Sequence, residues 1–133
     1  MALGAGQLKS KKPTLRREED AIQRNLVQYL PYMLPRPHVL FAVPNGGKRS
    51  PVEASIMKGL GVKPGVHDLV LLWDRRAFLM EVKASNGVLS PKQVEVHEEV
   101  VLTGCPSGVV RSLQDAIAFL RECGIPLTLK DGA

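Results

Sequence analysis

The feature that most constrains this sequence is a pair of short apolar runs, at residues 66–73 and 77–83, joined by a polar turn at residues 74–76. Apolar runs of this length with a turn between them are typical of β-strands, so we predict a hairpin. The second run ends in Glu81 and Lys83. A core strand has no structural use for these charged residues, which makes the hairpin the first place to look for chemistry.

Helices are predicted on both sides of this hairpin. An apolar stripe at helical spacing starts at Glu18, and the prolines at 31, 35 and 37 should end it because proline lacks an amide hydrogen. Residues 50–53 (SPVE) and 90–93 (SPKQ) each predict a helix start, with a serine cap, a proline at the first helical position and a reciprocal Glu or Gln. Ser112 should cap a last helix. The apolar members of the first stripe are Ile22, Leu26, Tyr29 and Leu30.

Two further strands complete the predicted order. Residues 38–43 (HVLFAV) and 108–111 are short apolar runs. The resulting order, α-β-α-β-β-α-β-α, predicts an α/β fold with a small mixed central sheet flanked by helices. A chain of 133 residues corresponds to one domain.

Composition excludes several classes of protein. No apolar run approaches the ~20 residues that span a bilayer, and no apolar signal core follows Met1. The two cysteines, Cys105 and Cys123, form no CxxC pair, so a disulfide scaffold or a structural zinc site is not expected. A reducing, cytoplasmic setting is therefore predicted.

The net charge of +5 is unevenly distributed. Residues 1–17 hold basic residues and no acidic one, and basic residues also outnumber acidic ones over residues 36–92. This pattern indicates a polyanionic partner, although a solvated surface with a basic tail would account for charge alone equally well. We expect residues 1–17 to lack fixed structure and residues 18–133 to form the domain. The basic residues of the tail are Lys9, Lys11, Lys12, Arg16 and Arg17.

The hairpin brings three charged side chains together. Residues two apart on a strand share a face, so Glu81 and Lys83 project together, and a tight turn would place Asp68 opposite them. Opposed residues have Cβ atoms ~4.5–5.5 Å apart, close enough for two carboxylates to share one cation. Oxygen ligands favour Mg²⁺ or Mn²⁺. A solvent-exposed ion pair at the strand ends is the alternative, and the continuous apolar run before Glu81 favours the metal site.

Other candidate residues are weaker. His38, His67 and His97 fall in three different predicted elements, and no phosphate-binding GxxxxGK[ST] or dinucleotide GxGxxG motif is present. The loop at residues 46–49 (GGKR) could hold phosphate through its amides and cations, or be a flexible connection.

Three sequence segments resemble the PD-(D/E)xK nuclease superfamily and, more narrowly, the virus-type replication-repair nuclease (VRR-NUC) family. They are residues 65–68 (GVHD), 81–83 (EVK) and 89–93 (LSPKQ). Residues 19–23 and 45–47 match earlier landmarks of that family, and the similarity extends over about residues 18–120. It implies a restriction-endonuclease-like αβββαβ core with an extra short helix. His67 stands where the family usually has proline.

The resemblance also implies roles for individual residues. Asp68 and Glu81 would be the main metal ligands, with the Val82 carbonyl completing the set, and Glu19 would bind a second metal or a metal-bound water. Lys83 would activate the attacking water and stabilise the developing charge, and Gln93 would orient the water or the scissile phosphate. Contacts to the DNA backbone are expected from Asn45, Lys48, Arg49 and the basic tail residues Lys9, Lys11, Lys12, Arg16 and Arg17.

The implied activity is that of a Mg²⁺- or Mn²⁺-dependent DNA endonuclease, selective for branched DNA in the manner of a Holliday-junction resolvase. A role in viral or mobile-element replication or repair, in the cytoplasm of a bacterial host, and a homodimer are implied with it. Its interface would use residues 31–37 and the helix carrying Ile56, Met57 and Leu60, unless these residues cover the monomer's own core. The alternatives are a non-catalytic nucleic-acid-binding module and a subunit of a larger DNA-processing complex.

Overall fold

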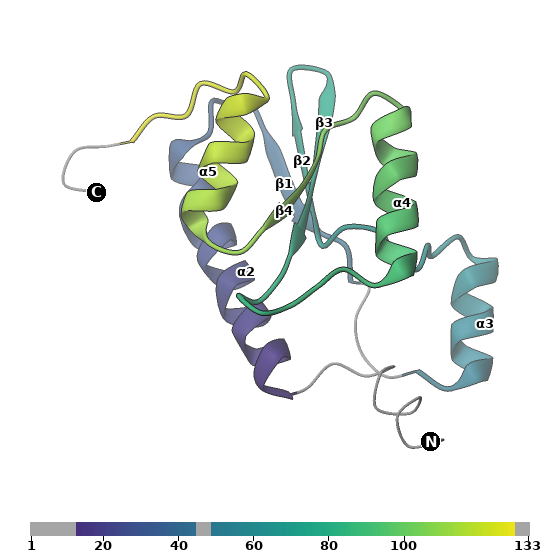
Figure 1. The fold of residues 1–133 in the computed structure, drawn as a ribbon. Coiled ribbons are helices and arrows are strands. Elements are labelled where there is room, and N and C mark those ends of the chain that lie inside the picture. The colour runs from purple at the N-terminus through teal and green to yellow at the C-terminus, as the bar shows by residue number, and fades with distance from the viewer. Residues whose placement is uncertain (1–12, 45–48, 130–133) are drawn as a thin grey trace.

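The computed structural model describes residues 13–44 and 49–129. Its elements follow the predicted order α-β-α-β-β-α-β-α (Figure 1). They are α2 (Pro13–Met33), β1 (Val39–Ala42), α3 (Pro51–Gly59), β2 (Leu69–Trp73), β3 (Arg76–Val82), α4 (Pro91–Leu102), β4 (Ser107–Val110) and α5 (Leu113–Glu122). In the part of the chain that is described, no helix is both long and apolar enough to cross a membrane.

The strands form one mixed sheet in the order β1-β2-β3-β4, which confirms the predicted fold class. β1 with β2 and β2 with β3 are antiparallel, whereas β3 and β4 are parallel. The β2–β3 hairpin turns at Asp74 and Arg75, whose φ angles of 51° and 62° are left-handed. Two consecutive left-handed residues make a turn whose twist suits an antiparallel pair, so the turn holds Trp73 opposite Arg76.

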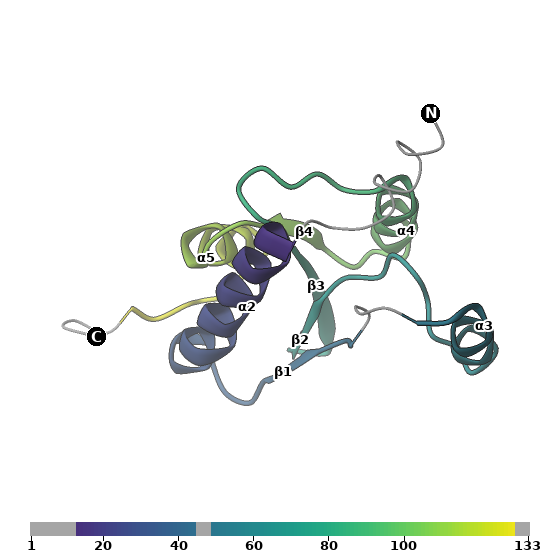
Figure 2. The same cartoon turned by 90° about the horizontal axis from the view of Figure 1, so that it is seen from below.

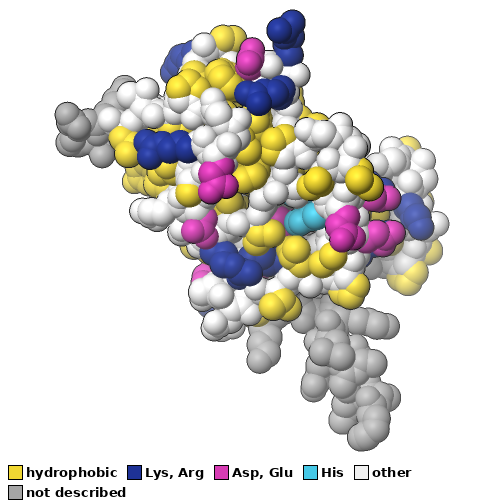
Figure 3. Space-filling model, turned by 45° about the horizontal axis from the view of Figure 1, so that its top comes forward, with side chains coloured by type: hydrophobic (Ala, Val, Ile, Leu, Met, Phe, Trp, Pro, Cys, Tyr) yellow, Lys and Arg dark blue, Asp and Glu magenta, His cyan; other side chains and the backbone are white. Residues whose placement is uncertain are grey.

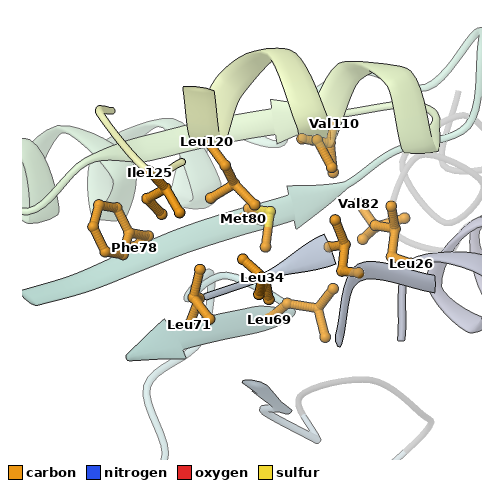
Figure 4. Packing of buried hydrophobic residues seen from close by; sticks show 12 residues of the cluster. Leu26, Leu34, Leu69, Leu71, Phe78, Met80, Val82, Val110, Leu120 and Ile125 are labelled. Carbon is orange, nitrogen blue, oxygen red and sulfur yellow. The ribbon is translucent and has the colours of Figure 1, made fainter. Parts of the chain in front are cut away.

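The hydrophobic core lies on the sheet face covered by α2 and α5, while α4 covers part of the other face (Figures 1 and 2). Side chains alternate between faces along a strand, so β3 sends every second residue into the core and the residues between them toward α4. Figure 4 shows how the core side chains of the sheet meet those of the two helices. The cluster includes Leu26, Leu30, Leu34, Leu69, Leu71, Phe78, Met80, Val82, Val110, Leu120 and Ile125.

The first helix is longer than predicted at both ends. α2 includes Pro13 and continues through Pro31 to Met33, so residues 13–17, which were expected to lack fixed structure, are helical. At its start, the Glu18 Oε2 atom accepts a hydrogen bond of 2.9 Å from the Ser85 amide, which ties this end to the loop after β3. Near its end, Pro31 removes a single amide, and the Leu34 amide closes the last turn on the Leu30 carbonyl at 3.0 Å.

Both predicted capping boxes are confirmed. Ser50 Oγ accepts from the Glu53 amide and Glu53 Oε1 accepts from the Ser50 amide, each at 3.1 Å. At α4, Ser90 Oγ accepts from the Gln93 amide at 3.2 Å, and Gln93 Oε1 accepts from the Ser90 amide at 2.9 Å. These contacts are local, which explains why four consecutive residues were enough to predict them.

Candidate active site

Asp68 and Glu81 lie side by side at one end of the β2–β3 hairpin. Leu69 pairs with Met80 in the ladder, so the next position outward places Asp68 beside Glu81. The Asp68 amide donates to the Met80 carbonyl at 3.1 Å, and the Asp68 Oδ2 atom accepts from the Val82 amide at 2.8 Å. The Asp68 carboxylate is therefore hydrogen-bonded to the backbone of β3 at Val82, the residue that follows Glu81.

Glu81 is held from the side of α4. Its side chain is 2% exposed, its Oε2 atom accepts from Gln93 Nε2 at 3.2 Å, and its Oε1 atom lies 3.5 Å from His97 Nε2. Gln93 therefore uses its oxygen to cap α4 and its nitrogen to contact Glu81. Because the capping box restricts the Gln93 side chain, the start of α4 sets the orientation of the Glu81 carboxylate.

Lys83 is buried as well, two residues after Glu81. Lys83 is 3% exposed, and its backbone amide donates to the Val110 carbonyl at 3.0 Å, which extends the pairing of β3 with β4. Burial lowers the pKa of His97, while the nearby Asp68 carboxylate raises it and the Lys83 charge lowers it. His97 thus senses the charges of Asp68 and Lys83 while its ring faces Glu81.

Two buried histidines stack on each other next to Glu81. The rings of His67 and His97 stack with centroids 3.8 Å apart and planes 19° from parallel, and His67 Nε2 lies 2.6 Å from Ser107 Oγ. Burial, and secondarily the neighbouring His97, lower the pKa of His67 to about 4. The three histidines do come from three different parts of the chain, as the sequence indicated, but the fold brings His67 and His97 together. The available signal was position: His67 precedes Asp68, and His97 follows Gln93 by one helical turn.

The loop that follows Lys83 is anchored from two other elements. Glu19 Oε2 of α2 accepts from the Ala84 amide at 3.3 Å. Arg111, directly after β4, donates from Nη1 to the carbonyls of Ala84 at 2.5 Å and Gly87 at 2.7 Å. Sequence reasoning missed Arg111, whose only signal is a cation directly after an apolar strand.

Removing the Arg111 side chain should therefore destabilise the protein. We expect Arg111→Met to lower the free energy of unfolding by about 2 kcal/mol, since hydrogen bonds from a charged donor contribute about 1.5–3 kcal/mol and the Ala84 and Gly87 carbonyls would each lose one. Denaturant titration followed by circular dichroism measures the change. Arg121→Met, at an exposed position of α5, is the matched control. Equal stability of Arg111→Met and Arg121→Met would contradict the anchoring role.

The donor atoms at this site fit a small divalent metal ion. Within residues 13–44 and 49–129, no three His, Cys, Asp or Glu side chains form a group able to hold a metal ion. A site on Asp68 and Glu81 would therefore rely on two carboxylates, the Val82 carbonyl and water. Mg²⁺ is commonly bound in this way, through one or two carboxylates with several waters retained. The role of Glu19 as a further ligand stays a prediction.

The structure describes three of the residues that are predicted to contact DNA. Arg16 and Arg17 are exposed in the first turns of α2. Arg49 is partly buried before α3, where Nη2 donates to the Pro44 carbonyl at 3.4 Å. The others lie outside the described residues: Lys9, Lys11, Lys12, Asn45 and Lys48.

Comparison with known proteins bears on the fold. No protein-family model and no curated protein matches this sequence. A solved structure described as a "VRR_NUC domain protein" is similar, with a TM-score of 0.65 and 21% sequence identity, over 79% of this chain and 86% of that one. The fold is therefore VRR-NUC-like and of nuclease type, as the sequence resemblance implied. At this identity the likeness establishes the fold alone.

Proposed function

We propose that this protein is a divalent-metal-dependent endonuclease that hydrolyses phosphodiester bonds in DNA. The observation that carries the proposal is the contact between Asp68 Oδ2 and the Val82 amide, which places the Asp68 carboxylate against the backbone between Glu81 and Lys83 on a nuclease-type fold. Acidic side chains paired beside a buried lysine match what phosphodiester hydrolysis requires: ligands for a metal ion, and a cation where negative charge develops.

The residues would divide the chemistry among them. Asp68, Glu81 and the Val82 carbonyl would hold Mg²⁺ or Mn²⁺, which supplies Lewis-acid polarisation of the phosphate when bound. Lys83, two residues after Glu81 on the same face, would place its positive charge against the phosphate oxygens. Gln93 would orient the phosphate or the attacking water while it keeps Glu81 in place. Glu19 would contribute from α2 if a second ion binds.

Branched DNA is the proposed substrate, in the manner of a Holliday-junction resolvase acting in viral or mobile-element replication or repair. A single small domain offers little surface for reading bases, which favours recognition of DNA shape. Four substrates test this directly: a four-way junction, a flap, a duplex and a single strand, each with Mg²⁺, Mn²⁺ or EDTA. We expect metal-dependent incision of the branched substrates. Absence of cleavage under every condition would overturn the proposal.

One observation favours a second candidate, a module that binds nucleic acid without cutting it. Glu81 is 2% exposed and already faces Gln93 and His97, so a metal ion must share this carboxylate with protein groups. Binding of the four substrates without incision in either metal would support this candidate.

We also propose that two copies of the chain assemble. α3 exposes Ile56 at 58% and Leu60, just beyond the helix, at 80%, and Tyr32 at the end of α2 is exposed as well. Leu34, in contrast, is buried in the monomer's own core, which is the alternative that the sequence left open for it. Closed two-fold dimers are the commonest homo-oligomers, and resolving a junction requires two symmetric cuts.

Light scattering should give a mass of about twice 14.5 kDa at micromolar concentration. Ile56→Glu combined with Leu60→Glu should yield monomers, because charges in an apolar interface are costly to bury. Val101→Glu, at an exposed apolar position on α4, is the control and should remain dimeric. A monomeric wild-type protein that makes uncoupled single nicks would contradict the dimer.

A further inference from the structure

A cleft of about 650 Å³ opens between α3 and the first turn of α4, next to the candidate active site. Gln93 is one of its lining residues and also donates to Glu81 Oε2 at 3.2 Å. The Gln93 side chain is therefore shared by the cleft and the site formed by Asp68 and Glu81. Arg49, which the sequence already predicts to contact DNA, also lines the cleft.

Every charged side chain among the described residues that line the cleft is basic. These residues are Arg49, Lys58 and Lys92. Lys63 joins Lys58 and Lys92 around a smaller hollow of about 320 Å³. Lys63 and Lys92 lie 3.5 Å from Glu99 and Glu95, but all four side chains are more than half exposed. Ion pairs this exposed contribute little, so these lysines can exchange their partners for a phosphate.

This concentration of one charge contrasts with the face drawn in Figure 3, where basic, acidic and apolar side chains are intermixed. The described lining also contains no aromatic residue. Stacking of bases on aromatic rings is the usual source of affinity for unpaired bases, so a ligand here would be held through its phosphates.

α3 forms one wall of the cleft through Pro51, Ala54, Ser55, Met57 and Lys58. Lys58 faces the cleft, whereas Val52, Ile56 and Leu60 are exposed and absent from its lining. None of the nine described residues of α3 is buried, and the helix stands beyond α4, away from the sheet (Figure 2). Packing against the core therefore does not explain the position of α3.

The floor of the cleft is set by a close backbone contact. Gly65 has a φ of +85°, and a Cβ atom there would lie 2.8 Å from the Lys92 carbonyl oxygen. The loop before β2 therefore approaches the first turn of α4 as closely as only glycine allows. This contact keeps Lys92 in place relative to the loop.

The size of the cleft suits a single strand. Cavities of roughly 300–1,000 Å³ hold ligands of drug size, and one or two nucleotides of a strand are ligands of that size. The cleft, at about 650 Å³, therefore accommodates a short stretch of one strand.

We propose that the α3–α4 cleft binds the sugar–phosphate backbone of one unpaired DNA strand and leads it to Asp68 and Glu81. This inference rests on the proposed nuclease function and narrows its substrate to branched DNA with unpaired nucleotides beside the cut. Lys58 and Lys92 contact the phosphates on opposite walls, and Gln93 marks the point where the strand enters the carboxylate cluster.

Binding in EDTA tests the inference without cleavage. The full-length chain is titrated into a fluorescent single strand and a fluorescent duplex, and anisotropy is followed at several salt concentrations. We expect Lys58→Gln with Lys92→Gln to weaken single-strand binding about tenfold or more and to reduce the salt slope by about 0.7 per lost contact. Arg24→Gln with Arg121→Gln removes the same charge from α2 and α5 and should preserve the slope.

Three results would overturn the inference: unchanged affinity in the cleft variant, equal losses in both double variants, or a larger loss for the duplex than for the single strand. Its failure is distinguishable from failure of the nuclease proposal. Metal-dependent cleavage with any of these three results refutes only the cleft, whereas a selective loss of single-strand binding without cleavage in Mn²⁺ refutes only the nuclease.

Discussion

Replacing Glu81 by glutamine is expected to reduce metal-dependent DNA cleavage by about a thousandfold or more. Loss of a carboxylate ligand removes several kcal/mol of metal-derived stabilisation from the transition state, and each ~1.4 kcal/mol corresponds to a factor of ten in rate. Asp68→Asn should have a similar effect. Single-turnover cleavage of a branched substrate in Mg²⁺ measures both.

The two substitutions should leave the fold intact because they preserve the observed hydrogen bonds. An amide oxygen at position 81 can still accept from Gln93, and one at position 68 can still accept from the Val82 amide. Thermal unfolding and DNA affinity in EDTA should therefore stay close to wild type. Glu122→Gln, at an exposed carboxylate on α5, is the control for charge alone. Full activity of Glu81→Gln in Mg²⁺ would rule out the proposed ligand set.

Acidification is expected to destabilise the metal-free protein through His67. The pKa of His67 is about 4 in the folded state, against an ordinary value of 6.5. Between these values the unfolded chain binds a proton that the folded protein does not, so stability is lost as the pH falls from 6.5 to 4 and the loss is constant below that. At ~1.4 kcal/mol per pH unit, the total is about 3 kcal/mol.

Denaturant titrations in EDTA at pH 7, 6, 5 and 4 measure this effect. Carboxylates also titrate in this range. We therefore compare how steeply the free energy of unfolding changes with pH in the wild type and in each variant. His67→Asn should make the dependence on pH shallower by the amount attributed to His67. His38→Asn removes a histidine whose Nδ1 contacts the Pro35 carbonyl at 3.0 Å, outside the stacked pair, and should retain most of the wild-type slope. Parallel curves for wild type and His67→Asn would contradict the buried neutral state of this ring.

Much of the fold and part of the site were predictable because the signals are local. The capping boxes at Ser50 and Ser90 need only four consecutive residues, and a turn at Asp74 and Arg75 leaves one register for the hairpin. That register brings Asp68 beside Glu81, so this pair was predictable from spacing. Proline was the misleading local signal, because α2 continues past Pro31 to Met33.

The sequence by itself thus determined the order of the elements and the place of the acidic pair, since adjacent strands and helix caps depend on neighbours in the chain. Only the tertiary structure decided what surrounds that pair. His97 meets His67, and Arg111 meets Ala84, through the packing of α4 and the parallel pairing of β4, over separations that carry no local pattern. The apolar residues Val52, Ile56 and Leu60 show the same limit. Their spacing of four residues is typical of the buried face of a helix, yet no element of the described fold covers them. Burial depends on which surfaces meet in three dimensions, and the spacing alone does not determine that.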